Sequence, residues 1–234
     1  MSISINNVGK TRVLIPKNPT TREVKGYQVG SLTRLLKRIF DLLMALILLC
    51  LILPLMLLII VVIRFESPGS ALFKHTRIGR DGKQFGCLKF RTMVNNAEIV
   101  LENLLAENPL LRNEWEQDFK LKDDPRVTRV GKFLRKTSLD ELPQIFNVLM
   151  GDMSFVGPRP IVKNEIPKYG KVFQYYKAVS PGVTGLWQVN GRNNVDYEQR
   201  VKLDYWYITN WSIWLDFTIL IRTLGVVMGR KGAY

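Results

Sequence analysis

Histidine and cysteine are scarce in this 234-residue chain, and their scarcity excludes several kinds of site. The single histidine, His75, excludes a His-rich metal centre and argues against a Ser-His-Asp triad. Cys50 lies in an apolar run and Cys87 in a predicted strand, so the two have neither metal-ligand spacing nor a common setting for a disulfide. We interpret both as reduced thiols that face the cytosol or lie in lipid.

Acidic residues are also few. The chain has 20 Asp and Glu against 34 Lys and Arg, for a net charge of +14. A charge this large implies an anionic partner such as nucleic acid, anionic lipid or a phosphorylated substrate. The chain has no recognisable nucleic-acid-reading motif, and its long apolar run argues against that partner, so we predict no nucleic-acid binding.

The chain does have one long apolar run, from Ile39 to Ile63. It can cross a bilayer, which takes about 20 residues, and it starts too far along the chain for a signal peptide. The simplest interpretation is a single-pass anchor. However, eight basic residues and one acid precede the run from residue 10, and seven basic residues and two acids follow it up to residue 91. Basic flanks mark the cytoplasmic side. Pro54 removes a backbone hydrogen bond and bends a helix, so we favour a re-entrant helix over residues 31–64.

Asp41 stands one turn into this run, at helical spacing from Lys37 and Arg38, and we expect it to pair with them. Residues 1–30 are polar and basic without an apolar period, which predicts a flexible arm. Residues 65–200 form the predicted cytosolic catalytic region.

Within that region the fold class is mainly α with a small β-hairpin. An Asp81-Gly82 turn predicts the hairpin over residues 71–91. Apolar periodicity and Gly/Pro punctuation predict further elements. These are one or two helices over 94–119 broken at Pro109, a short basic helix over 129–136, a helix over 139–149, an extended piece over 154–160, a helix over 165–178 and a loop over 181–192.

Residues 201–234 are rich in aromatic side chains and carry two charges, Asp216 and Arg222, in an apolar tail. Aromatic clusters are typical of a membrane–water interface, and the tail is too short and too charged for a span. We therefore predict interfacial helices lying on the bilayer surface; an ordinary aromatic core patch is the alternative.

Two adjacent acids, Asp140 and Glu141, stand at a predicted helix start after Ser138. Ser-x-x-Glu is the pattern of a capping box, and the helix dipole favours a negative charge on Asp140. Taken alone, the pair is explained by helix capping.

Basic residues elsewhere raise the interest of these acids. Lys89 and Arg91 stand on the second predicted strand, Arg159 is held between two prolines, and Arg192 follows an Asn-Gly turn. Guanidinium and ammonium groups bind phosphate, so together they form a candidate anion cradle. Two carboxylates facing a phosphate suggest Mg²⁺, and a carboxylate can itself attack phosphorus.

Several motifs occur in a specific order from about Leu32 to the C-terminus: KRIFD (37–41), the Pro54 helix, KFRTM (89–93), SLDELPQ (138–144), GDMSFVGPRP (151–160), PGVTG (181–185) and WQVNGR (187–192). In these the chain resembles the bacterial sugar transferases, which are monotopic polyprenyl-phosphate phosphoglycosyl transferases. The resemblance implies a re-entrant helix, bound Mg²⁺ and transfer of a sugar phosphate from a UDP-sugar to polyprenyl (undecaprenyl) phosphate, with release of UMP.

The resemblance also implies roles for individual residues. Asp140 would be the nucleophile that forms an aspartyl-phosphosugar intermediate, Glu141 its partner, and both would hold the metal. Lys89, Arg159 and Arg192 would contact phosphate or substrate, and Asp204 matches a further family acid.

The implied location is the cytoplasmic face of the bacterial inner membrane, in contact with its lipid, in exopolysaccharide, O-antigen or capsule assembly. The C-terminal part looks most like members that transfer galactose phosphate or glucose phosphate, and a homodimer is compatible with the sequence. The alternative is a non-enzymatic membrane scaffold or regulator that binds anionic lipid through its basic face.

Overall fold

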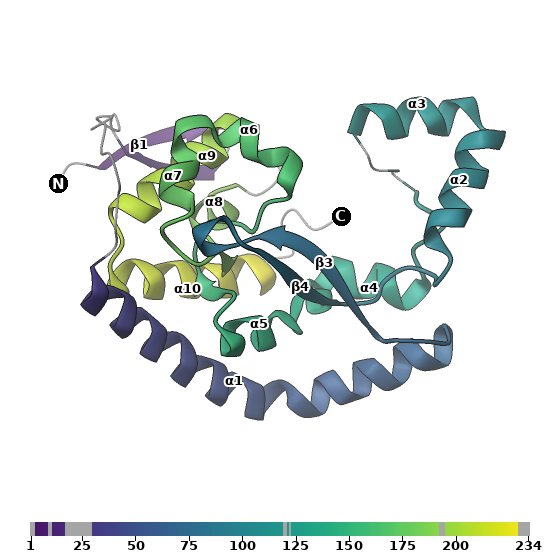
Figure 1. Cartoon of the computed structure of the whole chain (residues 1–234), viewed down its shortest axis with the longest axis horizontal. Helices are drawn as coiled ribbons and strands as arrows, with labels where there is room; N and C mark the ends of the chain where they lie inside the picture. Colours follow the sequence, from purple (N-terminus) through teal and green to yellow (C-terminus); the bar gives the residue numbers. More distant parts are fainter. Residues whose placement is uncertain are drawn as a thin grey trace. The chain divides into compact units, whose positions relative to one another are not determined.

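The computed structural model describes residues 3–8, 11–16, 30–118, 121, 123–191 and 195–228 (Figure 1). Its contacts divide the chain into two compact units. The larger unit contains Met1–Leu51, Lys74–Leu88 and Gln144–Gly232, and the smaller unit contains Ile52–Phe73, Lys89–Pro143 and Ala233–Tyr234.

The apolar run forms one long helix, α1, from Ser31 to Glu66, as expected of a run of 25 residues (39–63) that is apolar apart from Asp41 and has no glycine. The helix is continuous through Pro54. Among the described residues it is the one helix long and apolar enough to cross a membrane, and most of its apolar stretch is exposed. These properties are compatible with a membrane, while the re-entrant topology stays a prediction.

The predicted hairpin is confirmed as β3 (Leu72–Ile78) paired with β4 (Gln84–Phe90). The turn residues Asp81 and Gly82 both have positive φ, 58° and 74°. Glycine adopts this conformation freely and aspartate tolerates it, which is why the Asp-Gly pair predicted the turn correctly.

The larger unit contains a short parallel pair of strands, β5 (Ser154–Val156) and β6 (Gly182–Thr184). A strand and the helix α8 (Leu186–Val189) thus lie where we predicted a loop. The backbones meet closely, since a Cβ added to Gly182 would lie 2.1 Å from the amide nitrogen of Gly157. Such a pairing depends on residues far apart in sequence and leaves no local period.

The helix predicted over residues 165–178 is divided. Short helices α6 (Ile166–Tyr169) and α7 (Phe173–Tyr176) flank Gly170, whose φ is 49°. They pack with the long helix α9 (Tyr197–Thr209) around one hydrophobic core cluster: Ile78, Ile161, Tyr169, Tyr176 and Val201. After α9 comes α10 (Ile213–Met228).

The predicted flexible arm contains a pair of strands that the sequence analysis did not predict. β1 (Ile3–Val8) and β2 (Thr11–Pro16) pair in an antiparallel ladder. Both segments contain β-branched residues, which favour strands even in a polar stretch. The rest of the predicted arm, apart from Gly30, lies outside the described residues.

In the smaller unit the predicted break at Pro109 is confirmed, with α2 (Ala97–Glu107) before it and α3 (Pro109–Asp118) after it. The basic helix is confirmed as α4 (Arg129–Thr137). The single helix predicted over 139–149 is wrong. A 3-10 turn at Leu139–Glu141 precedes α5 (Gln144–Met150), because Pro143 cannot donate a backbone hydrogen bond to a continuing helix.

Candidate functional site

The two predicted catalytic acids lie on the 3-10 turn that follows α4. Ser138 adopts a left-handed conformation with φ 58°, and its amide donates back to the carbonyls of Leu134 and Arg135. Ser138 therefore ends α4 and makes no side-chain cap to the turn that follows, so the predicted capping box is wrong. Asp140 and Glu141 therefore follow the C-terminal end of α4, whereas we predicted them at the N-terminal end of a helix.

Lys89, at the end of β4, reaches both acids. Its Nζ lies 2.7 Å from Oε1 of Glu141 and 3.8 Å from Oδ2 of Asp140. All three side chains are at least partly buried, with Asp140 only 13% exposed. An ammonium group so close to two carboxylates partly offsets their mutual repulsion. The structure thus brings together three of the residues singled out in the sequence.

The charge of Asp140 is set by opposing effects. Burial raises its pKa from 3.8 to about 6; Lys89 and Arg135 lower it, and Glu141 raises it. We expected a helix N-terminus to keep this carboxylate ionised, but burial outweighs the charges around it. A pKa of about 6 still leaves most of the carboxylate ionised at neutral pH, which suits a nucleophile.

Arg135 is a member of this site that the sequence analysis missed. It stands in the last turn of α4, its Nε donates to Oγ1 of Thr92 at 2.9 Å, and its charge acts on Asp140. Nothing in the sequence distinguishes it from the other basic residues of α4. Only the chain reversal at Ser138 brings it to the acid.

Arg91 makes different contacts. Its guanidinium donates to the backbone carbonyls of Ser67 and Pro68 and to the side chain of Asn95. These bonds fix the chain that follows α1 to the end of the hairpin. A phosphate contact by Arg91 stays a prediction.

The other predicted site residues belong to the larger unit. Arg159 is exposed, and its guanidinium carbon lies 5.9 Å from the centre of the Trp187 ring. Asp204 is fully buried and accepts a hydrogen bond from the hydroxyl of Tyr169 at 2.8 Å. Arg192 lies outside the described residues.

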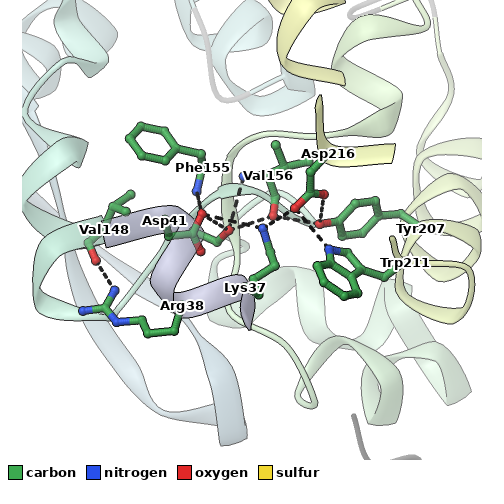
Figure 2. A network of polar contacts seen from close by, with 10 residues as sticks. Lys37, Arg38, Asp41, Val148, Phe155, Val156, Tyr207, Trp211 and Asp216 are labelled. Carbon is green, nitrogen blue, oxygen red and sulfur yellow. Dashed lines mark hydrogen bonds and ion pairs between the residues drawn. The ribbon is translucent and has the colours of Figure 1, made fainter. Parts of the chain in front are cut away.

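A buried ionic network connects the start of α1 with α10 (Figure 2). Lys37 Nζ lies 2.6 Å from Oδ2 of Asp216 and 3.7 Å from Oδ1 of Asp41, which confirms the predicted Lys37–Asp41 pair. Arg38 does not join that pair; it donates to the carbonyls of Val148 and Leu149 at the end of α5.

Asp216 is the centre of this network. It also accepts hydrogen bonds from the hydroxyl of Tyr207 at 2.8 Å and from Nε1 of Trp211 at 3.1 Å (Figure 2). The charge that we placed in an apolar tail is therefore fully paired. We predicted exposed aromatic side chains at a membrane surface, with an aromatic core patch as the alternative. The stretch contains both kinds of side chain, because Tyr207 and Trp211 bond to the buried Asp216 while Trp214 and Phe217 are exposed.

A model of the bacterial sugar transferase family matches residues 32–230. The chain belongs to this family. It is 54% identical over 202 residues to the undecaprenyl-phosphate galactose phosphotransferase of Salmonella typhimurium, and 53% identical over 202 residues to the UDP-galactose-lipid carrier transferase of Erwinia amylovora. Each match covers 86% of this chain and 42% of the relative, so the chain spans less than half of these longer proteins.

A shorter relative is covered almost completely. The exopolysaccharide production protein ExoY of Rhizobium meliloti is 47% identical over 198 residues, which are 85% of this chain and 88% of the relative. The family resemblance read from the motifs is thereby confirmed.

In this sugar transferase, the acid pair fits the donor set for a divalent cation. Mg²⁺ takes one or two carboxylates and completes its shell with phosphate oxygens and water, and Asp140 and Glu141 supply two carboxylates. The described residues hold no group of three or more His, Cys, Asp or Glu side chains that could bind a metal without substrate. Phosphate oxygens of a bound substrate and water would complete the shell of a metal held by these two carboxylates.

Proposed function

We propose that this bacterial sugar transferase moves a sugar 1-phosphate from a UDP-sugar to undecaprenyl phosphate and releases UMP. The activities in the names of its relatives support this reaction. The observation that carries it is the contact of Lys89 with both Asp140 and Glu141, because it pairs a partly buried carboxylate with a cation suited to phosphate. The proposed setting is the assembly of exopolysaccharide, O-antigen or capsule, as the name of the exopolysaccharide relative suggests.

The mechanism that we propose has two displacements at one phosphorus atom. A carboxylate oxygen of Asp140 attacks the β-phosphorus, the bond from phosphorus to the bridging oxygen breaks, and UMP leaves with that electron pair. An oxygen of undecaprenyl phosphate then attacks the same phosphorus, and the acyl-phosphate bond to Asp140 breaks. Lys89 offsets the negative charge that gathers around the phosphoryl group, and Glu141 holds Lys89 in place.

Asp140 and Glu141 would also hold Mg²⁺, which when bound supplies positive charge to the phosphate oxygens. Arg159 and Arg192 are proposed substrate contacts. The protein's own residues thus have separate tasks: nucleophile, charge compensation and substrate orientation.

We also propose that the enzyme lies on the cytoplasmic face of the inner membrane, with α1 re-entrant at Pro54. The basic residues on both sides of the apolar run Ile39–Ile63 support this topology. One face of α10 supports surface contact with lipid, because its large apolar side chains recur at helical spacing and are exposed: Ile213, Trp214, Phe217, Ile221 and Leu224.

The test is UMP release by the purified protein in nanodiscs with undecaprenyl phosphate, Mg²⁺ and a panel of UDP-sugars. We expect release with at least one sugar, UDP-galactose and UDP-glucose first. Asp140→Asn should lower the rate by at least about 10³-fold, since an amide cannot form the acyl-phosphate. A sugar labelled with ³²P at its phosphate should mark the wild-type protein covalently and leave Asp140→Asn unlabelled.

Asp123→Asn is the matched control, because Asp123 is an exposed acid of the same unit. It should keep the wild-type rate. Full activity in Asp140→Asn would exclude the covalent mechanism, and no turnover of any UDP-sugar by the wild type would favour the scaffold alternative.

A further inference from the structure

Asn147, on α5, is a polar side chain with no exposed surface. Its Oδ1 accepts the amide of Leu88 at 2.8 Å. Its Nδ2 donates to the carbonyl of Gly86 at 2.8 Å and to Oδ2 of Asp152 at 3.3 Å. A carboxamide has one acceptor oxygen and two donor hydrogens, so each of these groups has a partner within the larger unit.

The two backbone partners of Asn147 lie on the outer edge of β4. The amide of Arg91 donates across the hairpin to the carbonyl of Ala71 at 2.8 Å, so the odd-numbered positions of this strand direct their backbone groups toward β3. Backbone groups alternate between the two edges of a strand, and those of Gly86 and Leu88 therefore point away from β3. The side-chain amide of Asn147 takes the place that a peptide group of a third strand would have.

Asn147 is itself held in place by its surroundings. Its backbone carbonyl accepts the amides of Gly151 at 3.1 Å and of Met153 at 3.2 Å. The carbonyls of the next two residues of α5 accept hydrogen bonds from Arg38. A side chain on so constrained a backbone gives β4 a fixed point of attachment.

This attachment lies next to the candidate site along the chain. Lys89, whose Nζ lies 2.7 Å from Oε1 of Glu141, directly follows Leu88. The helix α5 begins at Gln144, three residues after Glu141. Asn147 therefore bonds the residue before the cation and stands on the helix that follows the acids.

We propose that Asn147 is a positioning residue that fixes the backbone of β4 at Leu88 and so keeps the ammonium group of Lys89 at Asp140 and Glu141. A side chain with no exposed surface cannot touch a substrate, so its effect on the reaction passes through Lys89. The inference rests on the proposed function for its catalytic readout only, because the pairing of Lys89 can be measured without turnover.

The catalytic test is a double-mutant cycle with Lys89→Ala, measured as UMP release in nanodiscs. Asn147→Ala removes both bonds to β4. We expect it to lower kcat by about 10-fold or more with Lys89 present and by less than about 2-fold in the Lys89→Ala background. KM should stay within about 3-fold, because Lys89 is proposed to offset charge that develops on the phosphoryl group.

The matched control is Val148→Ala. Val148 is the fully buried neighbour of Asn147 on α5, so its truncation also weakens the packing of this helix but leaves the bonds to β4 intact. Any loss of activity in this variant should be the same in both backgrounds. Equal losses for Asn147→Ala in both backgrounds would overturn the proposal, since they would mean that Asn147 does not act through Lys89.

Amine labelling gives a readout that needs no turnover. The acetylation rate of Lys89 by trace acetic anhydride, followed by mass spectrometry, should be low in the wild type because the ammonium group is paired and partly buried. Relative to Lys83, an exposed lysine of the same hairpin, it should rise by about 3-fold or more in Asn147→Ala and stay unchanged in Val148→Ala.

Unchanged labelling of Lys89 in Asn147→Ala overturns the proposal even if the protein turns over no UDP-sugar. Failure of the proposed function would show separately, as no UMP release by the wild type. If Asn147→Ala does not fold, Asn147→Ser serves in both measurements, because it keeps a polar side chain that is too short to bond both groups of β4.

Discussion

At the residue scale, the charge around Asp140 leads to a prediction about pH. Because burial raises its pKa to about 6, protonation at lower pH should remove the nucleophile, and kcat/KM should fall below about pH 6. Arg135→Gln removes a positive charge that lowers this pKa. The acid limb of the pH profile should therefore move to higher pH, measured as UMP release between pH 5 and 9.

Lys132→Gln is the control for this experiment, because Lys132 is an exposed cation of the same helix. Its acid limb should coincide with that of the wild type. An unmoved limb in Arg135→Gln would show that Arg135 does not act on the titrating group.

Some residues of the candidate site can be predicted from the sequence, and others depend on the fold. Lys89, Asp140 and Glu141 could be predicted, because residue type and motif mark them without knowledge of the fold. Arg135 could not, because its effect on Asp140 depends on a left-handed residue, Ser138, that most sequences would not place there. The burial of Asp204 is likewise a property of the core and not of its neighbours in the chain.

At the scale of elements, α4 lies against the backbone that follows the hairpin. A Cβ added to Gly131 would lie 2.1 Å from the carbonyl oxygen of Thr92, which also accepts the amide of Thr128. Gly131→Ala should therefore destabilise the protein by about 1–3 kcal/mol, despite the higher helix propensity of alanine. The measurement is the denaturant midpoint or Tm of the purified protein.

Gly225→Ala is the matched comparison. Gly225 lies in α10, and a Cβ there would meet nothing within 4 Å. The same substitution should leave stability unchanged or raise it by up to about 1 kcal/mol. A Gly131→Ala variant as stable as Gly225→Ala would contradict the close approach of α4 to Thr92.

The elements that could be predicted are those with local causes. The Asp81-Gly82 turn and the break at Pro109 depend on the backbone preferences of one or two residues. The pairing of β5 with β6 could not be predicted, because it joins three-residue segments that are separated by 25 residues (157–181). The division of residues 139–149 could not be predicted from apolar periodicity, because the period continues through Pro143 while the helix does not.

At the scale of the whole molecule, the topology of α1 can be tested in cells. We expect residues on either side of it to face the cytoplasm. In a background with Cys50→Ser and Cys87→Ser, single cysteines at Thr20→Cys and Lys83→Cys should react with a membrane-impermeant maleimide only after the cells are opened.

The matched variant for the topology test is Pro54→Leu, which restores a backbone donor at the centre of the run. A straighter helix of this length can span the bilayer, so one of the two cysteines should become accessible from outside. If one cysteine is accessible from outside when Pro54 is unchanged, the re-entrant topology is wrong and α1 is a single-pass anchor.

The ion pair between Lys37 and Asp216 has a consequence for biosynthesis. Its two residues are 179 positions apart, and ribosomes add about 5–20 residues per second. Asp216 is therefore synthesised roughly 10–40 s after Lys37. For most of that interval every residue of α1 has been synthesised, but Asp216 of α10 has not. The last helix to be synthesised, α10, therefore completes the buried ion pair at the start of the first long helix, α1.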